Sequence, residues 1–344
     1  MHMKSNLKVK QLARKFGIEA KEIKKVYYSV YRIVTPDGKT YCLKRMRYAP
    51  SQLKWIDRTL AKLRQHGFSR IAWRDRNRSG GKPLYIRRSP NGVPFLLMPW
   101  IKGVWPSPKS IGDMKESGKI LAEFHLAGKE IAITGSGSRN MIGKWPALFR
   151  QRHNVLLRKV RIAKTNGHGT ALDPLLRKHG AALIKRSRDA IRLMKNSGYR
   201  RACRNAREQG SLCHGDGGPT NIILTGGESY LIDFETLRHD LRAYDLFRVV
   251  YNSAKDHGFR YPIVKAILDG YQSVSKLNRD DIDLLKVWLA HPHRVSRILG
   301  KYDKLPYAKK LKKLRELRLV LSQERTILNL LPKLDDYLGK ESSG

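Results

Sequence analysis

The sequence predicts an α+β protein of two lobes, with an antiparallel sheet and one main helix in a small N-terminal lobe and a larger, mostly helical C-terminal lobe. Three observations predict this fold class. The 344 residues, 41% of them hydrophobic, allow about two folded units at roughly 150 residues each. Residues 27–103 contain short β-rich runs separated by turn signals. From residue 111 onwards, apolar residues recur mostly with helical spacing.

The N-terminal lobe is expected to span residues 1–99 and to begin with a helix and a hairpin. Residues 6–25 alternate basic and apolar positions in a helical manner. Residues 27–46 then read YYSVYRIVTPDGKTYCLKRM, two β-rich runs around the Pro-Asp-Gly of residues 36–38. Such a pattern predicts two antiparallel strands joined by a turn.

The rest of this lobe is predicted to be one helix and two more strands. The helix is expected at residues 51–65, because Ser51 stands at its start and Gly67 follows its end. Residues 82–103 read KPLYIRRSPNGVPFLLMPWIKG, which supplies two further strands with a turn at residues 90–92.

The C-terminal lobe is expected to span residues 100–344 and to be helical apart from one hairpin. That hairpin combines residues 221–225 and 229–234, which flank Gly226 and Gly227. The helices are predicted at residues 111–130, 145–163, 173–195, 243–256 and over most of 261–338.

The charge of the chain predicts acidic partners without identifying them. Lys and Arg number 70 against 29 Asp and Glu, a formal net charge of +41 spread along the whole chain. Nucleic acid, an anionic lipid face, phosphorylated proteins and other polyanions would all be attracted by such a field. No nucleic-acid recognition module is found, so a specific nucleic-acid partner is not expected.

Cysteine usage and hydropathy favour synthesis in a reducing compartment. Cys42, Cys203 and Cys213 form no C-x-x-C pair and give no disulfide framework or zinc site. The N-terminal residues are charged and lack the apolar core of a signal peptide, and no run approaches the roughly 20 apolar residues of a membrane span. A cytoplasmic protein without a membrane span is expected.

One turn-rich stretch, LCHGDGGPTNIIL at residues 212–224, contains candidate catalytic and metal-binding residues. Asp216 and Asn221 stand five positions apart on the loop that enters the predicted hairpin, and Asp233 follows its second strand in the run LIDFE. Carboxylate and amide oxygens suit a hard cation such as Mg²⁺. If two of the three hold the metal, Asp216 remains free to accept a proton from an attacking hydroxyl or to orient it.

This spacing resembles the catalytic loop and metal aspartate of kinases. HGDGGPTN followed by IDFE is similar to the aminoglycoside phosphotransferase and choline kinase branch of the protein-kinase-like fold. Within that branch, other runs resemble the bacterial spore coat family of CotS type: TPDGKTYCLKRM, QHGF, FLLMPWIKG, LAEFH and DLRAYDLFR. The resemblance extends from about residue 27 to residue 299 and implies a bilobal protein-kinase-like fold.

The resemblance implies a role for each matching residue in a reaction that uses ATP and Mg²⁺. Asp216 takes the place of the catalytic base, and Asn221 and Asp233 take the places of the magnesium ligands. Lys44 takes the position of the lysine that binds the α and β phosphates. Residues 95–103 correspond to the hinge between the lobes.

The same resemblance implies supporting roles. Backbone groups near Met98 and Trp100 would face the adenine, and Ser29 with neighbouring amides would cover the phosphates. Asp245 corresponds to a helix aspartate that braces the catalytic loop. His214 and Asp240 are expected to support the same region.

The sequence also departs from the kinase pattern. The segment VYYSVYR lacks the G-x-G-x-x-G loop, and the helix at residues 51–65 offers Asp57 but no Glu to pair with Lys44. Gly218 stands where related loops carry a histidine. These departures leave a second interpretation open, a catalytically weak or inactive kinase fold that serves as a structural component of the spore coat.

Other residues have structural interpretations. His125 is predicted to be a packed helix residue, and His291 and His293, which flank a proline, to lie in a turn. Asp280, Asp281 and Asp283 are expected to cap a helix start. The leucines of residues 307–325 predict a helix that packs its apolar stripe on the helical lobe and leaves a cationic outer face.

The function predicted from these observations is transfer of the γ-phosphoryl group of ATP to a hydroxyl, in association with the spore coat. Helices on the expected substrate side, after Arg260, are strongly basic, which disfavours cationic acceptors such as aminoglycosides or choline. An anionic small molecule or an acidic or phosphorylated coat protein fits this field better.

Overall fold

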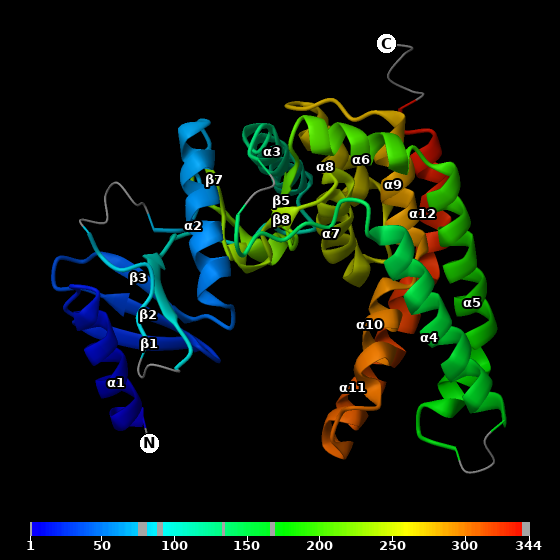
Figure 1. Cartoon of the computed structure of the whole chain (residues 1–344), viewed down its shortest axis with the longest axis horizontal. Coiled ribbons are helices and arrows are strands. Elements are labelled where there is room, and N and C mark those ends of the chain that lie inside the picture. The colour runs from blue at the N-terminus through cyan, green and yellow to red at the C-terminus, as the bar shows by residue number, and fades with distance from the viewer. Residues whose placement is uncertain (1, 75–80, 88–91, 133–134, 166–168, 339–344) are drawn as a thin grey trace.

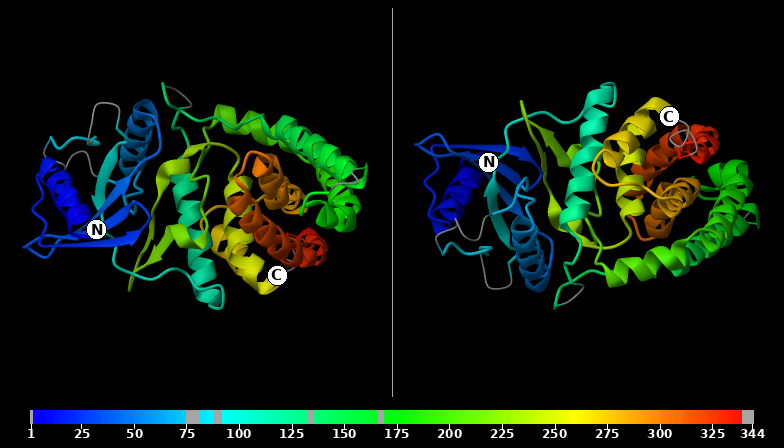
Figure 2. Two further views of the ribbon diagram at one scale, coloured as in Figure 1. Left: turned by 90° about the horizontal axis from the view of Figure 1, so that it is seen from below. Right: turned by 90° about the horizontal axis from the view of Figure 1, so that it is seen from above.

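The computed structural model describes residues 2–74, 81–87, 92–132, 135–165 and 169–338. It has two lobes, with a small sheet-containing lobe at one end and helices α4 and α5 at the other (Figures 1 and 2). This confirms the predicted α+β, kinase-like architecture. Among the described helices, none is long and apolar enough to cross a membrane.

The N-terminal lobe is built on a four-stranded sheet of order β1-β2-β3-β4 with antiparallel neighbours. Helix α1 packs on one face of this sheet through a cluster that includes Phe16, Ile33 and Leu43. Helix α2 lies between the sheet and the helical lobe (Figure 1). The elements are α1 (His2–Lys15), β1 (Glu22–Tyr27), β2 (Val30–Val34), β3 (Thr40–Arg45), α2 (Pro50–Gln65) and β4 (Phe95–Pro99).

The prediction of a helix over residues 6–25 was wrong in its second half. Helix α1 ends at Lys15, and Gly17 adopts a φ of 69°, a left-handed conformation that stops the helix. The chain then forms the edge strand β1, most of whose side chains are exposed. An exposed edge strand carries little hydrophobic alternation, so its sequence resembles a charged helix face.

Two further details of this lobe differ from prediction. Helix α2 begins with Pro50 after Ala49, and Ser51 provides no side-chain cap, because Pro at the first turn already suits a helix start. Of the two strands predicted in residues 82–103, the described residues give β4 and a single bridge between Ile86 and Phe95. Residues 90 and 91 of the predicted turn lie outside the described residues.

The C-terminal lobe is helical around two short β ladders, β5 with β8 and β6 with β7. Helices α3 and α8 pack closely, since a Cβ on Gly118 would lie 1.9 Å from the Ile267 carbonyl oxygen. The elements are α3 (Ile111–Ala127), α4 (Trp145–Thr165), α5 (Asp173–Asn196), α6 (Tyr199–Glu208), β5 (Leu212–Cys213), η1 (Pro219–Asn221), β6 (Ile222–Leu224), β7 (Ser229–Leu231), η2 (Phe234–Thr236), β8 (Arg238–His239), α7 (Arg242–Ala254), η3 (Lys255–His257), α8 (Tyr261–Gln272), α9 (Arg279–Ala290), α10 (His293–Tyr302), α11 (Tyr307–Gln323), η4 (Glu324–Thr326) and α12 (Ile327–Asp335).

Most helical predictions in this lobe are confirmed, and one helix was missed. The predicted hairpin at residues 221–234 is present as β6 and β7. On α11, Leu314 and Leu317 are buried against α10, as the leucine stripe predicted. Helix α6 was missed because its sequence, YRRACRNARE, has few apolar side chains to reveal a helical period.

The two lobes share one continuous hydrophobic core. Leu53 and Ile56 of α2 belong to the same buried cluster as Leu231 and Phe234 of the C-terminal lobe. The backbone of Ala72 donates a hydrogen bond to the carbonyl of Leu231 at 2.9 Å. This junction fixes the position of the sheet relative to the loop that follows β5.

Candidate active site

The loop between β5 and β6 carries Asp216 and is shaped by a glycine. Gly215 adopts a φ of 80°, and a Cβ at this position would come within 2.3 Å of the Thr236 carbonyl oxygen. Only glycine fits such a backbone without displacing its neighbour. The turn leaves the Asp216 carboxylate half-exposed at the interlobe side.

Asp245 on α7 holds the backbone of this loop. Its fully buried carboxylate accepts hydrogen bonds from the amides of His214 at 2.6 Å and Gly215 at 2.8 Å. His125 donates from Nε2 at 3.2 Å and accepts at Nδ1 from the Tyr271 hydroxyl at 2.9 Å. Burial alone would raise the pKa of Asp245, but the hydrogen bond from His125 and the electrostatic effects of His125, His214 and Arg238 outweigh burial and lower the pKa. The geometry matches the brace implied by the sequence.

The buried set His125, Cys213 and Asp245 places three possible metal donors close together. Cys213 donates its Sγ–H to the Asp240 carbonyl, and burial raises its pKa well above the ordinary value, so the thiolate form is disfavoured. His125 and Asp245 are hydrogen-bond partners of each other, and Cys213 is occupied by the Asp240 carbonyl. His125 is therefore a packed helix residue, as predicted, with the added task of orienting Asp245.

His214 and Asn221 fix the two ends of the loop. The buried His214 ring donates from Nε2 to the Ile232 carbonyl at 2.8 Å and accepts at Nδ1 from the Asp216 amide at 3.3 Å. Asn221 donates from Nδ2 to the Asp216 carbonyl at 2.7 Å. This bond uses the amide NH₂ group of Asn221, so its Oδ1 remains an acceptor that a cation could bind.

Lys44 reaches from β3 across to the C-terminal lobe. Its Nζ lies 2.8 Å from Asp233 Oδ1 and 2.7 Å from Glu235 Oε1. Burial opposes the charge of Lys44, but the two carboxylates outweigh burial and raise the pKa of Lys44. Burial and the like charge of Asp233 raise the pKa of Glu235. The structure thus holds a protonated lysine between two acids at the interlobe boundary.

Glu235 was not assigned a role from the sequence, although it ends the quoted run IDFE. Glu235 supplies the carboxylate partner of Lys44 that helix α2 does not provide. The only acid of α2, Asp57, is buried and has other partners. Asp57 bonds Arg74 Nη2 at 2.9 Å and Trp73 Nε1 at 3.0 Å. Glu235, two positions after Asp233, therefore takes the place of the missing helix Glu as a partner of Lys44.

Asn221 and Asp233 fit a divalent cation by their chemistry and position. Asp233 adopts a left-handed backbone conformation, with φ 64° and ψ 57°, at the start of η2. This uncommon conformation for a non-glycine residue is typical of functional sites. The pair offers one amide and one carboxylate oxygen, the donor type that Mg²⁺ prefers.

The sequence analysis did not predict a partner for Asp216, and the structure supplies one in Arg248. Arg248 on α7 follows Asp245 by three positions, so both side chains lie on one helix face. Its Nη2 forms an ion pair with Asp216 Oδ1, while its Nε is buried without an acceptor among the described residues. Arg248 was present in the quoted run YDLFR, where it reads as one of many surface cations.

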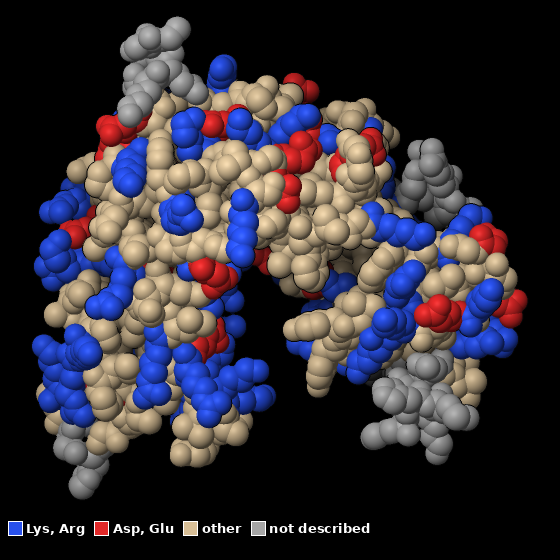
Figure 3. All heavy atoms as spheres, turned by 180° about the vertical axis from the view of Figure 1, so that it is seen from behind, with Lys and Arg blue, Asp and Glu red and all other residues tan. Residues whose placement is uncertain are grey.

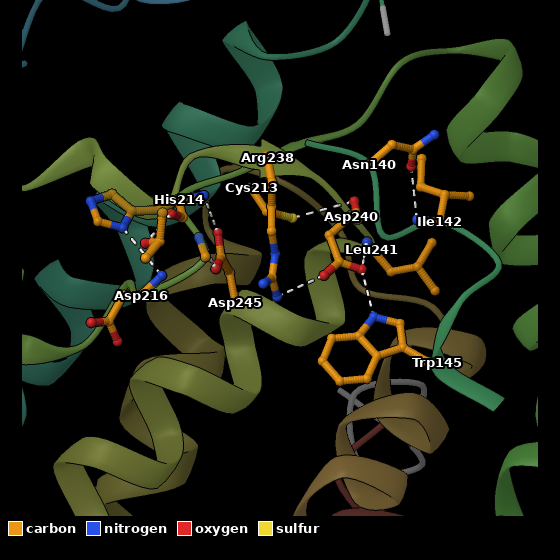
Figure 4. Close-up of polar contacts among 12 residues, drawn as sticks. Asn140, Ile142, Trp145, Cys213, His214, Asp216, Arg238, Asp240, Leu241 and Asp245 are labelled. Atoms are coloured by element: carbon orange, nitrogen blue, oxygen red, sulfur yellow. Dashed lines mark hydrogen bonds and ion pairs between the residues drawn. The ribbon is translucent and has the colours of Figure 1, made fainter. Parts of the chain in front are cut away.

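Asp240 lies away from the loop carboxylate and has a structural task. It pairs with Arg238 at 2.8 Å and accepts from Trp145 Nε1 at 2.8 Å. Burial raises its pKa to about 6 despite Arg238. Figure 4 shows Asp216 pointing away from both Asp240 and Asp245. Asp240 thus fastens β8 to the start of α4, which extends the support predicted for this region.

The predicted nucleotide residues of the N-terminal lobe lie at opposite sides of its sheet, Ser29 between β1 and β2 and Met98 and Trp100 in and after β4. Ser29 lies in the β1–β2 turn, half-buried, and its carbonyl accepts from the Arg45 amide at 3.0 Å. Met98 is buried and pairs in register with Cys42. The Trp100 amide donates to the Thr40 carbonyl at 3.1 Å, so this N–H is occupied within the sheet.

The remaining histidines and aspartates singled out in the sequence have structural roles. His291 and His293 are buried at the start of α10, and burial followed by nearby Arg152 lowers both pKa values well below the ordinary value. Asp281 forms a capping box with Asn278 at the start of α9, as predicted. Asp280 instead pairs with Arg201 at 2.6 Å.

Comparison with known proteins agrees with the fold and the motifs. The profile of the phosphotransferase enzyme family matches residues 19–277. Spore coat protein S of Bacillus subtilis strain 168 is 26% identical over 263 residues, which cover 76% of this chain and 73% of that protein. A homoserine kinase of Rhizobium johnstonii is 26% identical over 248 residues, 66% of this chain and 68% of the enzyme.

Solved structures with the same fold include phosphotransferases and kinases. An aminoglycoside phosphotransferase from Alicyclobacillus acidocaldarius superposes with a TM-score of 0.80 at 18% identity and covers 96% of each chain. An amicoumacin kinase, solved in complex with AMP-PNP, Ca²⁺ and Ami, gives a TM-score of 0.62 at 14% identity over 94% of this chain and 96% of that chain. The resemblance inferred from the motifs is confirmed.

Proposed function

The chain belongs to the phosphotransferase enzyme family, and from this premise we propose that it transfers the γ-phosphoryl group of ATP to a hydroxyl acceptor in association with the spore coat. One observation carries the proposal. Lys44 of one lobe is held at 2.8 Å from Asp233 of the other, beside the loop that bears Asp216 and Asn221. Phosphoryl transfer requires this convergence of a phosphate cation, metal ligands and a base.

Each residue of the site has a defined task in the proposed reaction. Lys44 binds phosphate oxygens of the nucleotide, and Asn221 and Asp233 hold Mg²⁺, which neutralises phosphate charge when bound. Asp216 accepts the proton of the acceptor hydroxyl while the oxygen of that hydroxyl forms a bond to the γ-phosphorus. The bond from that phosphorus to the oxygen bridging to the β-phosphate breaks, and ADP leaves. The amicoumacin kinase structure with AMP-PNP and Ca²⁺ supports this use of nucleotide and divalent cation.

A second candidate function is a non-catalytic role in the spore coat, in which the fold binds nucleotide or acidic coat proteins without turnover. The ion pair between Arg248 and Asp216 favours it, because an arginine on the base opposes proton acceptance. Similarity to spore coat protein S supports a place in the coat for either function. Nucleotide binding without phosphoryl transfer would distinguish this candidate from the enzyme.

Replacing Lys44 with Ala is expected to weaken Mg–ATP binding about 10- to 100-fold, since charge-assisted hydrogen bonds contribute roughly 1.5–3 kcal/mol. Isothermal titration calorimetry on the native protein and the variant checks this. Lys39→Ala is the matched control, because Lys39 makes the same charge change in the exposed β2–β3 turn, where it pairs with Asp37. Equal losses in both variants would show that net charge, and not the Lys44 site, binds the nucleotide.

A further inference from the structure

Three arginines surround His293 near the junction of helices α4, α7 and α10, and one of them contacts Asp216. Arg248 of α7 contacts Asp216, Arg152 of α4 contacts His293 of α10, and Arg297 follows on α10. His293 lies within electrostatic range of Arg152, Arg248 and Arg297, and its ring packs at 5.6 Å from that of Phe247. We call Arg152, Arg248 and Arg297 the arginine cluster.

Arg152 is half-buried, and no acid among the described residues pairs with it. Within the described ranges it forms no ion pair with a carboxylate, and its Nη1 donates to the neutral His293 Nδ1 at 2.9 Å. Burial, together with the charges of Arg297 and Arg238, lowers the pKa of Arg152 to about 10. A charge so placed destabilises the protein unless an anion compensates it.

Arg248 also has unused donor capacity beside the loop. Its side chain is 13% exposed, its Nη2 pairs with Asp216, and its Nε is buried without an acceptor in the described part of the chain. Arg297 is exposed and makes no ion pair with a described residue. The cluster therefore combines buried and accessible guanidinium groups, of which Arg248 contacts the Asp216 carboxylate.

A hollow that is open to solvent separates the two lobes. Figure 3 shows a hollow between the two lobes with Lys and Arg on both of its walls. An acceptor that delivers its hydroxyl to Asp216 would place its neighbouring groups beside Arg248, the member of the cluster that contacts this carboxylate.

We propose that the arginine cluster binds a carboxylate or phosphate group of the phosphoryl acceptor, an inference that rests on the proposed function. Guanidinium groups suit either anion, since their planar donors match two oxygens at once. An anion on the cluster also competes with Asp216 for Arg248. Acceptor binding thus loosens the ion pair and leaves the Asp216 carboxylate free for the acceptor hydroxyl, so the same contact selects the acceptor and prepares the base.

The test uses glycerol 3-phosphate and glycerol as probes that share hydroxyls and differ in the anion. Each is titrated into the native protein at fixed ionic strength, with and without saturating Mg–ADP. We expect glycerol 3-phosphate to bind at least roughly 10-fold more tightly than glycerol, in keeping with an arginine–phosphate contact. Saturating Mg–ADP fills the nucleotide phosphate sites, so glycerol 3-phosphate that still binds in its presence must bind elsewhere.

Single substitutions locate the binding. Arg152→Ala and Arg297→Ala are each expected to lower the affinity for glycerol 3-phosphate about 10-fold, whereas Arg158→Ala, an exposed arginine of the same helix α4, leaves it within about twofold. Arg297 is exposed, so its variant keeps the test valid if Arg152→Ala fails to fold. Equal affinities of the native protein and both cluster variants, or an equal loss in Arg158→Ala, would overturn the inference.

The two proposals fail in different ways. A native protein that binds glycerol 3-phosphate through the cluster but does not bind Mg–ADP would contradict the proposed phosphotransferase while supporting the anion site. A protein that binds Mg–ADP but does not distinguish glycerol 3-phosphate from glycerol would contradict the anion site alone.

Discussion

Asp216→Asn is expected to lower the rate of phosphoryl transfer about 10²- to 10⁴-fold, the contribution of a positioned general base. Asparagine has nearly the same shape as aspartate but cannot accept the acceptor proton. The affinity for Mg–ATP should change by less than about threefold, because the nucleotide is held by Lys44, Asn221 and Asp233 in this account. Initial rates and calorimetric affinities measured on the same preparations separate these two effects.

Two controls make the Asp216 result interpretable. Asp256→Asn applies the same replacement to a half-exposed surface acid and should leave the rate unchanged. Asp216→Asn also leaves Arg248 without its carboxylate, so the melting temperature must be shown to match the native value within a few degrees. An unchanged transfer rate in a folded Asp216→Asn protein would remove Asp216 from the reaction.

Asp245→Ala is expected to destabilise the protein by about 3–5 kcal/mol, the usual effect of removing one partner from a buried charged network. The substitution leaves the amides of His214 and Gly215 and the ring of His125 without their acceptor. Such a loss is a large part of the roughly 5–15 kcal/mol that stabilises a typical domain. Urea unfolding gives the change from the midpoint and slope.

The matched variant for this position is Asp245→Asn. It keeps one carbonyl oxygen as an acceptor for the loop but removes the charge, so it should be destabilised by less than Asp245→Ala. If both variants have the same midpoint of urea unfolding as the native protein, the loop backbone does not depend on Asp245. The shape of the loop would then come from Gly215 and His214 alone.

The order of the main site residues could be predicted from the sequence because local spacing encodes it. Asp216 and Asn221 lie on one loop, and Asp233 follows the hairpin that this loop enters. Residues on one loop and the hairpin that it enters have little freedom to lie far apart. Lys44 was assigned from the resemblance of the run YCLKRM to the kinase pattern, and the structure brings its Nζ to 2.8 Å from Asp233, 189 positions later in the sequence.

The partners of these residues could not be predicted, because they depend on how distant segments face one another. Glu235 pairs with Lys44 across the two lobes, and Arg248 pairs with Asp216 across α7 and the loop. In a chain with 70 Lys and Arg, no local pattern marks one arginine as the partner of a site acid. Asp57 illustrates the converse, since its burial against Trp73 and Arg74 is decided by packing.

The secondary structure shows the same division. Helices with an apolar stripe, such as α11, were predicted because burial repeats with the helical period. Strand β1 and helix α6 were missed because they bury few side chains. Elements at the surface contribute little hydrophobic pattern to the sequence, so their identity is set by their neighbours.

Phosphoryl transfer at this site can be measured by incubating the protein with ATP labelled at the γ-phosphate and Mg²⁺, alone and with an extract of the source organism. We expect label transfer to an acceptor, and this transfer should require Mg²⁺ and be lost in Asp233→Asn. Binding of labelled ATP with no transfer to any acceptor, or transfer that Asp233→Asn leaves unchanged, would show that the protein is not a phosphotransferase of the proposed kind.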